Sequence, residues 1–138
     1  GTFEPLEAIQ IENQRLHSEW FEVRASTIRQ LRSIRGNGGR IVAVGTTSCR
    51  VLESCAREGE GAEAGEARDA RDWTDLFIYP PYPFRLVDAL ITNFHLPRSS
   101  LLALVMAFAG EELTRAAYAE AIRERYRFFS YGDAMLVV

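Results

Sequence analysis

The sequence contains no lysine, although it has 16 basic residues, and all of them are arginine. It has two cysteines, Cys49 and Cys55, which are too few for a disulfide framework and do not have the spacing of metal ligands. Its longest apolar run, residues 101–109, is far shorter than the roughly 20 residues that span a bilayer. No signal peptide opens the chain. These absences predict a cytoplasmic protein with no bound metal and no membrane attachment.

The rest of the composition is that of an ordinary globular protein of 138 residues, which is one domain or a piece of a larger one. The net charge of -3 gives no overall attraction to nucleic acid. Arginine is nevertheless the better ligand for phosphates and stacked bases. Its exclusive use is therefore either a compositional bias of the genome or a sign of nucleic-acid binding. Two groups could touch a phosphate backbone or simply form solvated helix faces, namely Arg24, Arg29, Arg32 and Arg35, and Arg123, Arg125 and Arg127.

Hydrophobic periodicity predicts strands that alternate with helices. The expected strands cover residues 16–23, 41–44, 76–79, 84–91 and 134–138. Four helices are expected. The first covers residues 26–35, with Ser26 as its cap, and the second follows the strand at 41–44 and runs through Glu53 to residue 57. The third covers 101–109, with Ser99 or Ser100 as its cap, and the fourth covers 111–125. Residues 41–44 are apolar on both faces, which is typical of a central parallel strand. We therefore expect an α/β fold with a mainly parallel sheet and flanking helices. Residues 58–72 lack apolar side chains larger than alanine and are expected to form a mobile loop.

The first candidate site is the segment GTTSCR, residues 45–50, between a predicted strand and a predicted helix. Gly45 permits a tight turn, and the hydroxyls of Thr46, Thr47 and Ser48 would lie at the positive end of the helix dipole. Such a place suits a phosphate, a carboxylate or ribose hydroxyls, and Arg50 could hold an anion with two hydrogen bonds. Hydroxyl residues are also the usual helix caps, so capping alone remains the alternative.

The second candidate site is TNFHLP, residues 92–97, which also follows a predicted strand. Thr92 and Asn93 can donate and accept hydrogen bonds, and His95 titrates near neutral pH. Because ligands of open α/β sheets bind at the carboxyl ends of strands, we expect this segment to lie near residues 45–48. The alternative is that Asn93 holds the turn and that His95 is a loop histidine with its hydrogen bonds satisfied.

Two further candidates lie near the ends of the chain. His17 and Glu19 would face the same way on a strand, and a carboxylate beside an imidazole is a common acid–base arrangement. In SYGDAM, residues 130–135, Asp133 follows a glycine turn and could act as a base or accept a hydrogen bond, with Tyr131 beside it. The alternatives are a structural polar pair and an ordinary turn aspartate.

Together, and in this order, the segments GTFEP, HSEWFEV, RIVAVGTTSCRVLES, TDLFIYP, RLVDALITNFHLPRSSLLALVMAFAG and RYRFFSYGDAML resemble the S-adenosylmethionine:tRNA ribosyltransferase-isomerases of queuosine biosynthesis. The resemblance runs over residues 1–138. Pro81 departs from a usual glycine, and Cys49 from a frequent valine. The family's chains are longer and carry a separate β-barrel domain, so the resemblance implies the carboxy-terminal part of a larger, barrel-like α/β catalytic domain.

The resemblance also implies a reaction. The family transfers and isomerises the ribosyl group of S-adenosylmethionine onto 7-aminomethyl-7-deazaguanine at the wobble position of tRNA. Epoxyqueuosine forms, and adenine and methionine leave. S-adenosylmethionine is thus a co-substrate, no metal is expected, tRNA is the partner, and the full-length enzyme is expected to be a monomer, with association possible for a fragment.

On this basis we expect proton transfer by residues among His17, Glu19, His95 and Asp133. Substrate binding is expected from Gly45, Thr46, Thr47, Ser48, Arg50, Thr92, Asn93 and Tyr131. Two rival interpretations remain. The chain could bind tRNA or a nucleoside without catalysis, or it could be an unrelated nucleotide-binding α/β domain.

Overall fold

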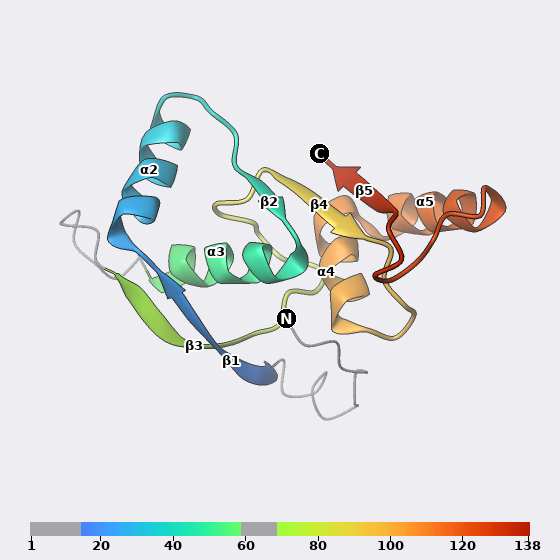
Figure 1. Ribbon diagram of the computed structural model, residues 1–138, viewed down its shortest axis with the longest axis horizontal. Helices are drawn as coiled ribbons and strands as arrows, with labels where there is room; N and C mark the ends of the chain where they lie inside the picture. Colours follow the sequence, from blue (N-terminus) through green and yellow to red (C-terminus); the bar gives the residue numbers. More distant parts are fainter. Residues whose placement is uncertain (1–14, 59–68) are drawn as a thin grey trace.

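The computed structural model describes residues 15–58 and 69–138, which form a mixed α/β fold of two small sheets and four helices (Figure 1). In chain order the elements are β1 (Arg15–Val23), α2 (Ala25–Gly36), β2 (Val42–Val44), α3 (Thr46–Glu58), β3 (Ala70–Leu76), β4 (Ala89–Asn93), α4 (Ser100–Ala109), α5 (Glu111–Arg123) and β5 (Ala134–Val137). None of these helices is long and apolar enough to cross a membrane.

The larger sheet has three strands in the order β2-β4-β5. β2 runs parallel to β4, and β5 runs antiparallel to it. The expectation of a mainly parallel sheet is therefore wrong for the described residues, because their one other strand pair, β1 with β3, is also antiparallel. Within residues 15–58 and 69–138, β2 lies at the edge of this sheet rather than at its centre. In the run 41–44, Ile41 and Ala43 are buried while Val42 and Val44 are exposed, so the run is apolar on both faces but covered on one.

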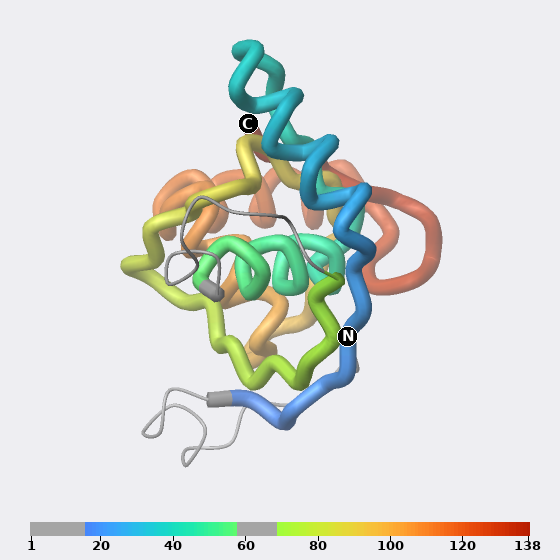
Figure 2. The backbone as a smooth tube through the Cα atoms, turned by 90° about the vertical axis from the view of Figure 1, so that its left-hand side faces the viewer, coloured from blue at the N-terminus to red at the C-terminus, as the bar shows by residue number. Residues whose placement is uncertain are grey.

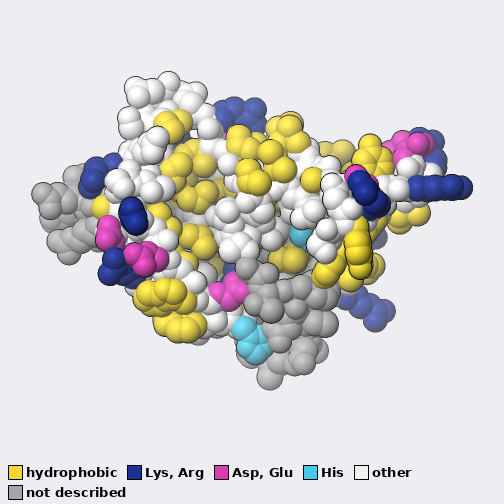
Figure 3. Space-filling view, in the orientation of Figure 1, with side chains coloured by type: hydrophobic (Ala, Val, Ile, Leu, Met, Phe, Trp, Pro, Cys, Tyr) yellow, Lys and Arg dark blue, Asp and Glu magenta, His cyan; other side chains and the backbone are white. Residues whose placement is uncertain are grey.

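The uncovered face of this sheet remains apolar in character. Val44 pairs with Ile91, and Ile91 pairs with Leu136, which places three aliphatic side chains in a row across the strands. Val44 and Leu136 are 66% and 61% exposed. A space-filling view shows apolar side chains gathered over the middle of the molecule and charged ones toward its ends (Figure 3).

The smaller sheet is an antiparallel ribbon of β1 and β3, which we call the β1–β3 ribbon. The strand expected at 76–79 instead ends at Leu76 and begins at Ala70, inside the segment that was expected to be a loop. Cross-strand pairs compensate for the low apolar content there. Trp20 lies opposite Trp73, and Arg71 forms an ion pair with Glu22 at 2.9 Å. Residues 59–68 of the expected loop lie outside the described residues.

Helix α3 contacts both sheets, through β3 of the ribbon and through β2 and β4 (Figure 2). On the ribbon side, the hydroxyls of Ser54 and Thr74 are 2.7 Å apart and buried. On the sheet side, Cys49 of α3 and Leu104 of α4 share one core with residues of all three strands. That core consists of Ala43, Cys49, Leu76, Ile78, Val87, Leu90, Leu104 and Val137.

A buried carboxylate explains why the strand expected at 84–91 begins only at Ala89. Glu53 of α3 is fully buried and accepts hydrogen bonds from the backbone N–H groups of Arg85, Leu86 and Val87, each at 2.9 Å. These donors are therefore turned toward α3 and are not available to a neighbouring strand.

The helix boundaries agree with the sequence at some ends and differ at others. Ser99 caps α4 as expected, because its Oγ accepts the N–H of Leu102. The expected cap at Ser26 is wrong. Helix α2 begins at Ala25, and the N–H of Ala25 donates to the carboxylate of Asp69 at 2.9 Å. Helix α5 ends at Arg123, two residues before the expected end.

Candidate active site at the end of the three-stranded sheet

Three segments that are distant in sequence meet where β2 and β4 end and β5 begins. The N–H of Gly45 donates to the carbonyl of Ile91 at 2.8 Å, which joins residues 45–48 to the end of β4. Asn93 pairs with Ala134, and its side-chain amide donates to the carbonyl of Asp133 at 3.3 Å. The predicted proximity of the GTTS, TNFH and YGD segments is thus confirmed. The end of a parallel strand pair is where ligands of open α/β sheets bind.

Gly45 shapes the first of these segments. Its φ of 90° lies in the left-handed region, and its carbonyl accepts the N–H of Cys49, which starts α3. Helix α3 begins at Thr46, so the hydroxyl residues 46–48 form its first turn and not a separate loop before it. Thr46 is buried, whereas Thr47 and Ser48 are exposed in the first turn. These two side chains therefore lie at the positive end of the helix dipole and face solvent.

His95 is buried beneath this edge. Its Nε2 lies 2.7 Å from the hydroxyl of buried Thr92, and its backbone N–H donates to the hydroxyl of Tyr118 at 2.8 Å. Burial lowers the pKa of His95 from 6.5 to about 4. At neutral pH the imidazole is neutral and hydrogen-bonded, so it orients Thr92 rather than carrying a charge. This geometry agrees with the alternative of a satisfied loop histidine.

Asp133 lies at the start of β5 and is held by Arg127. Its Oδ2 accepts the backbone N–H of Arg127 at 2.5 Å and the Nε–H of the same residue at 3.4 Å. The backbone hydrogen bond, followed by the side-chain one, lowers the pKa of Asp133, which is thus a carboxylate at neutral pH. Tyr131, two residues earlier, is exposed. The edge therefore presents an amide, a carboxylate and a helix N-terminus.

Glu19 and Arg50 form a second polar site, between the β1–β3 ribbon and α3. Nη1 of Arg50 lies 3.0 Å from Oε2 of Glu19, and Nη2 of Arg50 lies 3.4 Å from the carbonyl of Thr74. His17 is exposed at the start of β1, and the β1–β3 register is irregular between Arg15 and Glu19. The structure thus gives Glu19 an arginine partner that the local sequence pattern did not suggest.

Glu19 and Arg50 line a cavity of about 240 Å³, which we call the ribbon cavity. Its walls are Glu19, Trp20, Phe21, Thr47, Arg50, Val51 and Thr74. Sequence reasoning missed Trp20 and Thr74, because pairing of β1 with β3 brings them there and no local motif marks them. Thr47 belongs both to this cavity and to the turn that follows Gly45.

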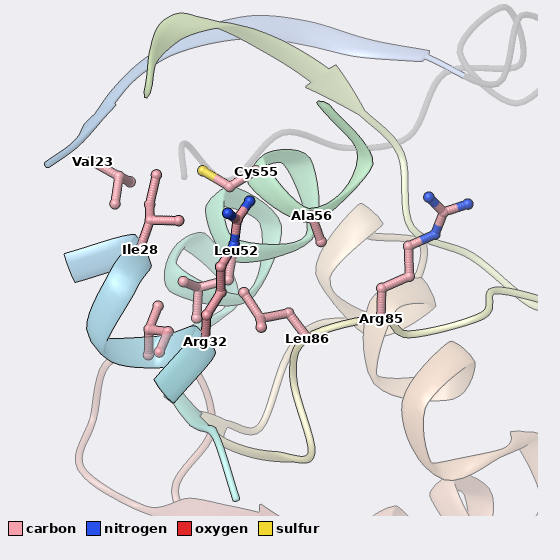
Figure 4. A pocket seen from close by; sticks show the side chains of 9 residues that line it. Val23, Ile28, Arg32, Leu52, Cys55, Ala56, Arg85 and Leu86 are labelled. Carbon is pink, nitrogen blue, oxygen red and sulfur yellow. The ribbon is translucent and has the colours of Figure 1, made fainter. Parts of the chain in front are cut away.

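A separate cavity of about 230 Å³ lies between α2, α3 and residues 85–86 (Figure 4). Its walls are largely aliphatic, with Arg32, Cys55 and Arg85 among them, and it contains none of the predicted site residues. The other cysteine, Cys49, is inert in the core. Burial, and then the charge of Glu53, raise its pKa to about 12, so it remains a protonated thiol.

The fold and the sheet edge define an α/β protein with a candidate binding region at strand ends. Within that class, the chain belongs to the queuosine biosynthesis protein family, whose model matches residues 1–137. It is 55% identical over its whole length to the S-adenosylmethionine:tRNA ribosyltransferase-isomerase of Thermotoga petrophila, and 55% identical over 99% of its length to that of Burkholderia vietnamiensis. Relatives in this family are therefore named as enzymes.

A solved structure agrees with this assignment. The crystal structure of S-adenosylmethionine tRNA ribosyltransferase from Thermotoga maritima matches 86% of this chain with a TM-score of 0.78 and 55% identity. The match covers 40% of that chain. Likewise, this chain spans 39% of the Thermotoga petrophila relative. The chain thus spans about two fifths of the length of these relatives.

Proposed function

We propose that this chain supplies part of the active site of an enzyme that transfers and isomerises the ribosyl group of S-adenosylmethionine. The acceptor is 7-aminomethyl-7-deazaguanine at the wobble position of tRNA, the product is epoxyqueuosine, and adenine and methionine are released. Family membership supports the reaction class. The observation that carries the proposal is the meeting of Gly45 with Ile91 and of Asn93 with Asp133 at one sheet edge.

The chemistry needs groups of the kinds found at this edge. A sulfonium makes the adjacent 5′ carbon acidic, so a base must remove a proton there. Ribose hydroxyls need donors and acceptors that fix their orientation. In the proposed site Asn93 and the first turn of α3, with Thr46, Thr47 and Ser48, bind ribose hydroxyls, and Asp133 accepts a hydrogen bond or a proton.

His95 has a more limited role in this proposal. Because its pKa is about 4, the ring is neutral at neutral pH and is a weak base. We assign it the orientation of Thr92 by the 2.7 Å hydrogen bond. Protonation of the departing adenine then falls to another group, and His17 on β1 remains a candidate. The enzyme is proposed to act in the cytoplasm, as a monomer, with no metal.

A chimaera tests the proposal. This chain replaces the matching segment of the Thermotoga petrophila relative, and adenine release from S-adenosylmethionine is measured with tRNA that carries the precursor base. We expect release by the chimaera, and a loss of roughly tenfold or more for Asn93→Ala, which removes one oriented donor. The same assay on the 138-residue chain alone separates catalysis from mere binding of tRNA or nucleoside.

Asn37→Ala is the matched control, because Asn37 is the C-cap of α2 and lies outside the sheet edge. Its rate should equal that of the unaltered chimaera. Equal rates for Asn93→Ala and Asn37→Ala, or no adenine release by the unaltered chimaera, would contradict the proposal.

A further inference from the structure

The ribbon cavity contains an ion pair that is only partly enclosed. The side chain of Arg50 is 8% exposed, whereas that of Glu19 is 28% exposed. The side chain of Glu19 is therefore partly accessible, and both residues line the ribbon cavity.

The guanidinium of Arg50 is not fully coordinated. It can donate five hydrogen bonds, and its contacts to Glu19 and to the carbonyl of Thr74 use Nη1 and Nη2. Its Nε is buried and has no hydrogen-bond partner among residues 15–58 and 69–138. A buried donor without a partner is unfavourable, so an additional acceptor near this guanidinium would be stabilising.

A cavity that contains both a positive and a negative side chain favours a ligand that itself carries both a negative and a positive group. A phosphate would meet the carboxylate of Glu19, and a simple cation would meet Arg50. An α-amino acid group satisfies each. Its carboxylate fits Arg50 and the first turn of α3 at Thr47, and its ammonium fits Glu19.

The size of the cavity limits how much of a ligand it can hold. About 240 Å³ is below the roughly 300–1,000 Å³ of pockets that enclose a drug-sized molecule. It therefore suits an amino acid group and not a whole nucleoside. Thr47 lines the cavity and is two residues from Gly45 at the sheet edge. A nucleoside joined to an amino acid group in the cavity would therefore extend toward that edge.

We infer that the ribbon cavity binds the methionine portion of S-adenosylmethionine, with Glu19 on the ammonium and Arg50 on the carboxylate. This inference rests on the proposed function, and it assigns Glu19 to binding rather than to proton transfer. The cavity holds one end of the co-substrate while the sheet edge holds the ribose.

Two ligands separate this role from a structural one. S-adenosylmethionine carries the amino acid group, whereas 5′-methylthioadenosine keeps the nucleoside and lacks that group. In the chimaera, Glu19→Gln should raise the Kd for S-adenosylmethionine by roughly tenfold or more, because the amide keeps an acceptor oxygen but loses the charge that strengthens its hydrogen bond to the ammonium. The Kd for methylthioadenosine should stay within about twofold. Isothermal titration calorimetry measures both.

The ribbon itself provides a matched control. Glu22 lies on the same strand as Glu19 and pairs with Arg71 at 2.9 Å, but it does not line the cavity. Glu22→Gln should leave both Kd values unchanged.

The outcomes distinguish the inference from the proposed function. If the chimaera releases adenine but Glu19→Gln binds S-adenosylmethionine with unchanged affinity, the inference fails and the proposed function stands. An equal loss for both ligands would show that Glu19 supports the fold and would also overturn the inference. If the unaltered chimaera binds neither ligand and releases no adenine, both fail.

Discussion

Oε1 of Glu53 lies 2.9 Å from the backbone nitrogen of Val87, and this buried contact joins α3 to the segment that leads into β4. Two more backbone N–H groups, those of Arg85 and Leu86, donate to the same carboxylate. Because α3 follows Gly45 and β4 ends at Asn93, the contact also fixes the relative position of the two segments that form the sheet edge.

Glu53→Gln is expected to destabilise the chain. An amide keeps one acceptor oxygen, so at least one of the three backbone donors loses its partner, at a cost of about 1–3 kcal/mol in the free energy of unfolding. Urea unfolding followed by circular dichroism measures this loss. Glu111→Gln is the control, because it removes only an exposed ion pair with Arg115 and should change stability by less than about 0.5 kcal/mol. Similar midpoints for the two variants would contradict the assignment.

The pKa of His95 predicts an acid-sensitive stability. The folded pKa of about 4 is lower than the ordinary 6.5, so between these values the unfolded chain binds a proton that the folded chain does not. The stability linked to His95 is fully present above pH 6.5 and is lost as the pH falls toward 4. Its slope reaches about 1.4 kcal/mol per pH unit, and the total is roughly 3 kcal/mol.

The chain contains two histidines, which makes this prediction easy to isolate. The free energy of unfolding should fall between pH 7.5 and pH 5 by more in the unaltered chain than in His95→Gln. His17→Gln, which changes the exposed histidine, should keep the full pH dependence. An NMR titration that places the pKa of the His95 ring near 6.5 would show that the ring is not buried.

Gly45→Ala is expected to perturb the site through the backbone alone. A Cβ at Gly45 would meet nothing within 4 Å, but the φ of 90° is unfavourable for alanine by about 1–2 kcal/mol. Unfolding should shift by that amount, and adenine release by the chimaera should fall because the first turn of α3 moves. Gly36→Ala is the control. It has equally open surroundings without a positive φ, at the end of α2, and should be neutral or slightly stabilising. Equal effects of the two substitutions would refute the strain argument.

Sequence patterns predicted the features of this structure that depend on neighbouring residues alone. The cap at Ser99, the apolar helix after it, the turn at Gly45 and the presence of a strand through Ile91 all follow from residue types and spacing, although that strand was expected over 84–91 and covers Ala89–Asn93. The meeting of the site segments also followed, because the carboxyl ends of parallel strands lie at one edge. One parallel pair, β2 with β4, was sufficient for this rule to hold.

The features that the sequence did not predict depend on contacts between segments that are distant in the chain. A local sequence pattern does not reveal such contacts. Strand β3 is stabilised by ion and indole pairs with β1 across the ribbon, and its own composition suggests a loop. Arg50 is a partner of Glu19, because α3 docks against that ribbon. The depressed pKa of His95 arises from burial under β4 and α5, which periodicity in the TNFHLP segment does not indicate.

The chain has two tryptophans, and both lie on the β1–β3 ribbon, with Trp20 and Trp73 in edge-to-face contact at 5.8 Å between ring centroids. Trp20 also forms a wall of the ribbon cavity. All indole fluorescence of this chain therefore originates beside the cavity. Because the two rings are close enough to influence each other's emission, a change in wavelength or intensity reports without any label on the conformation of the ribbon that forms one wall of the cavity.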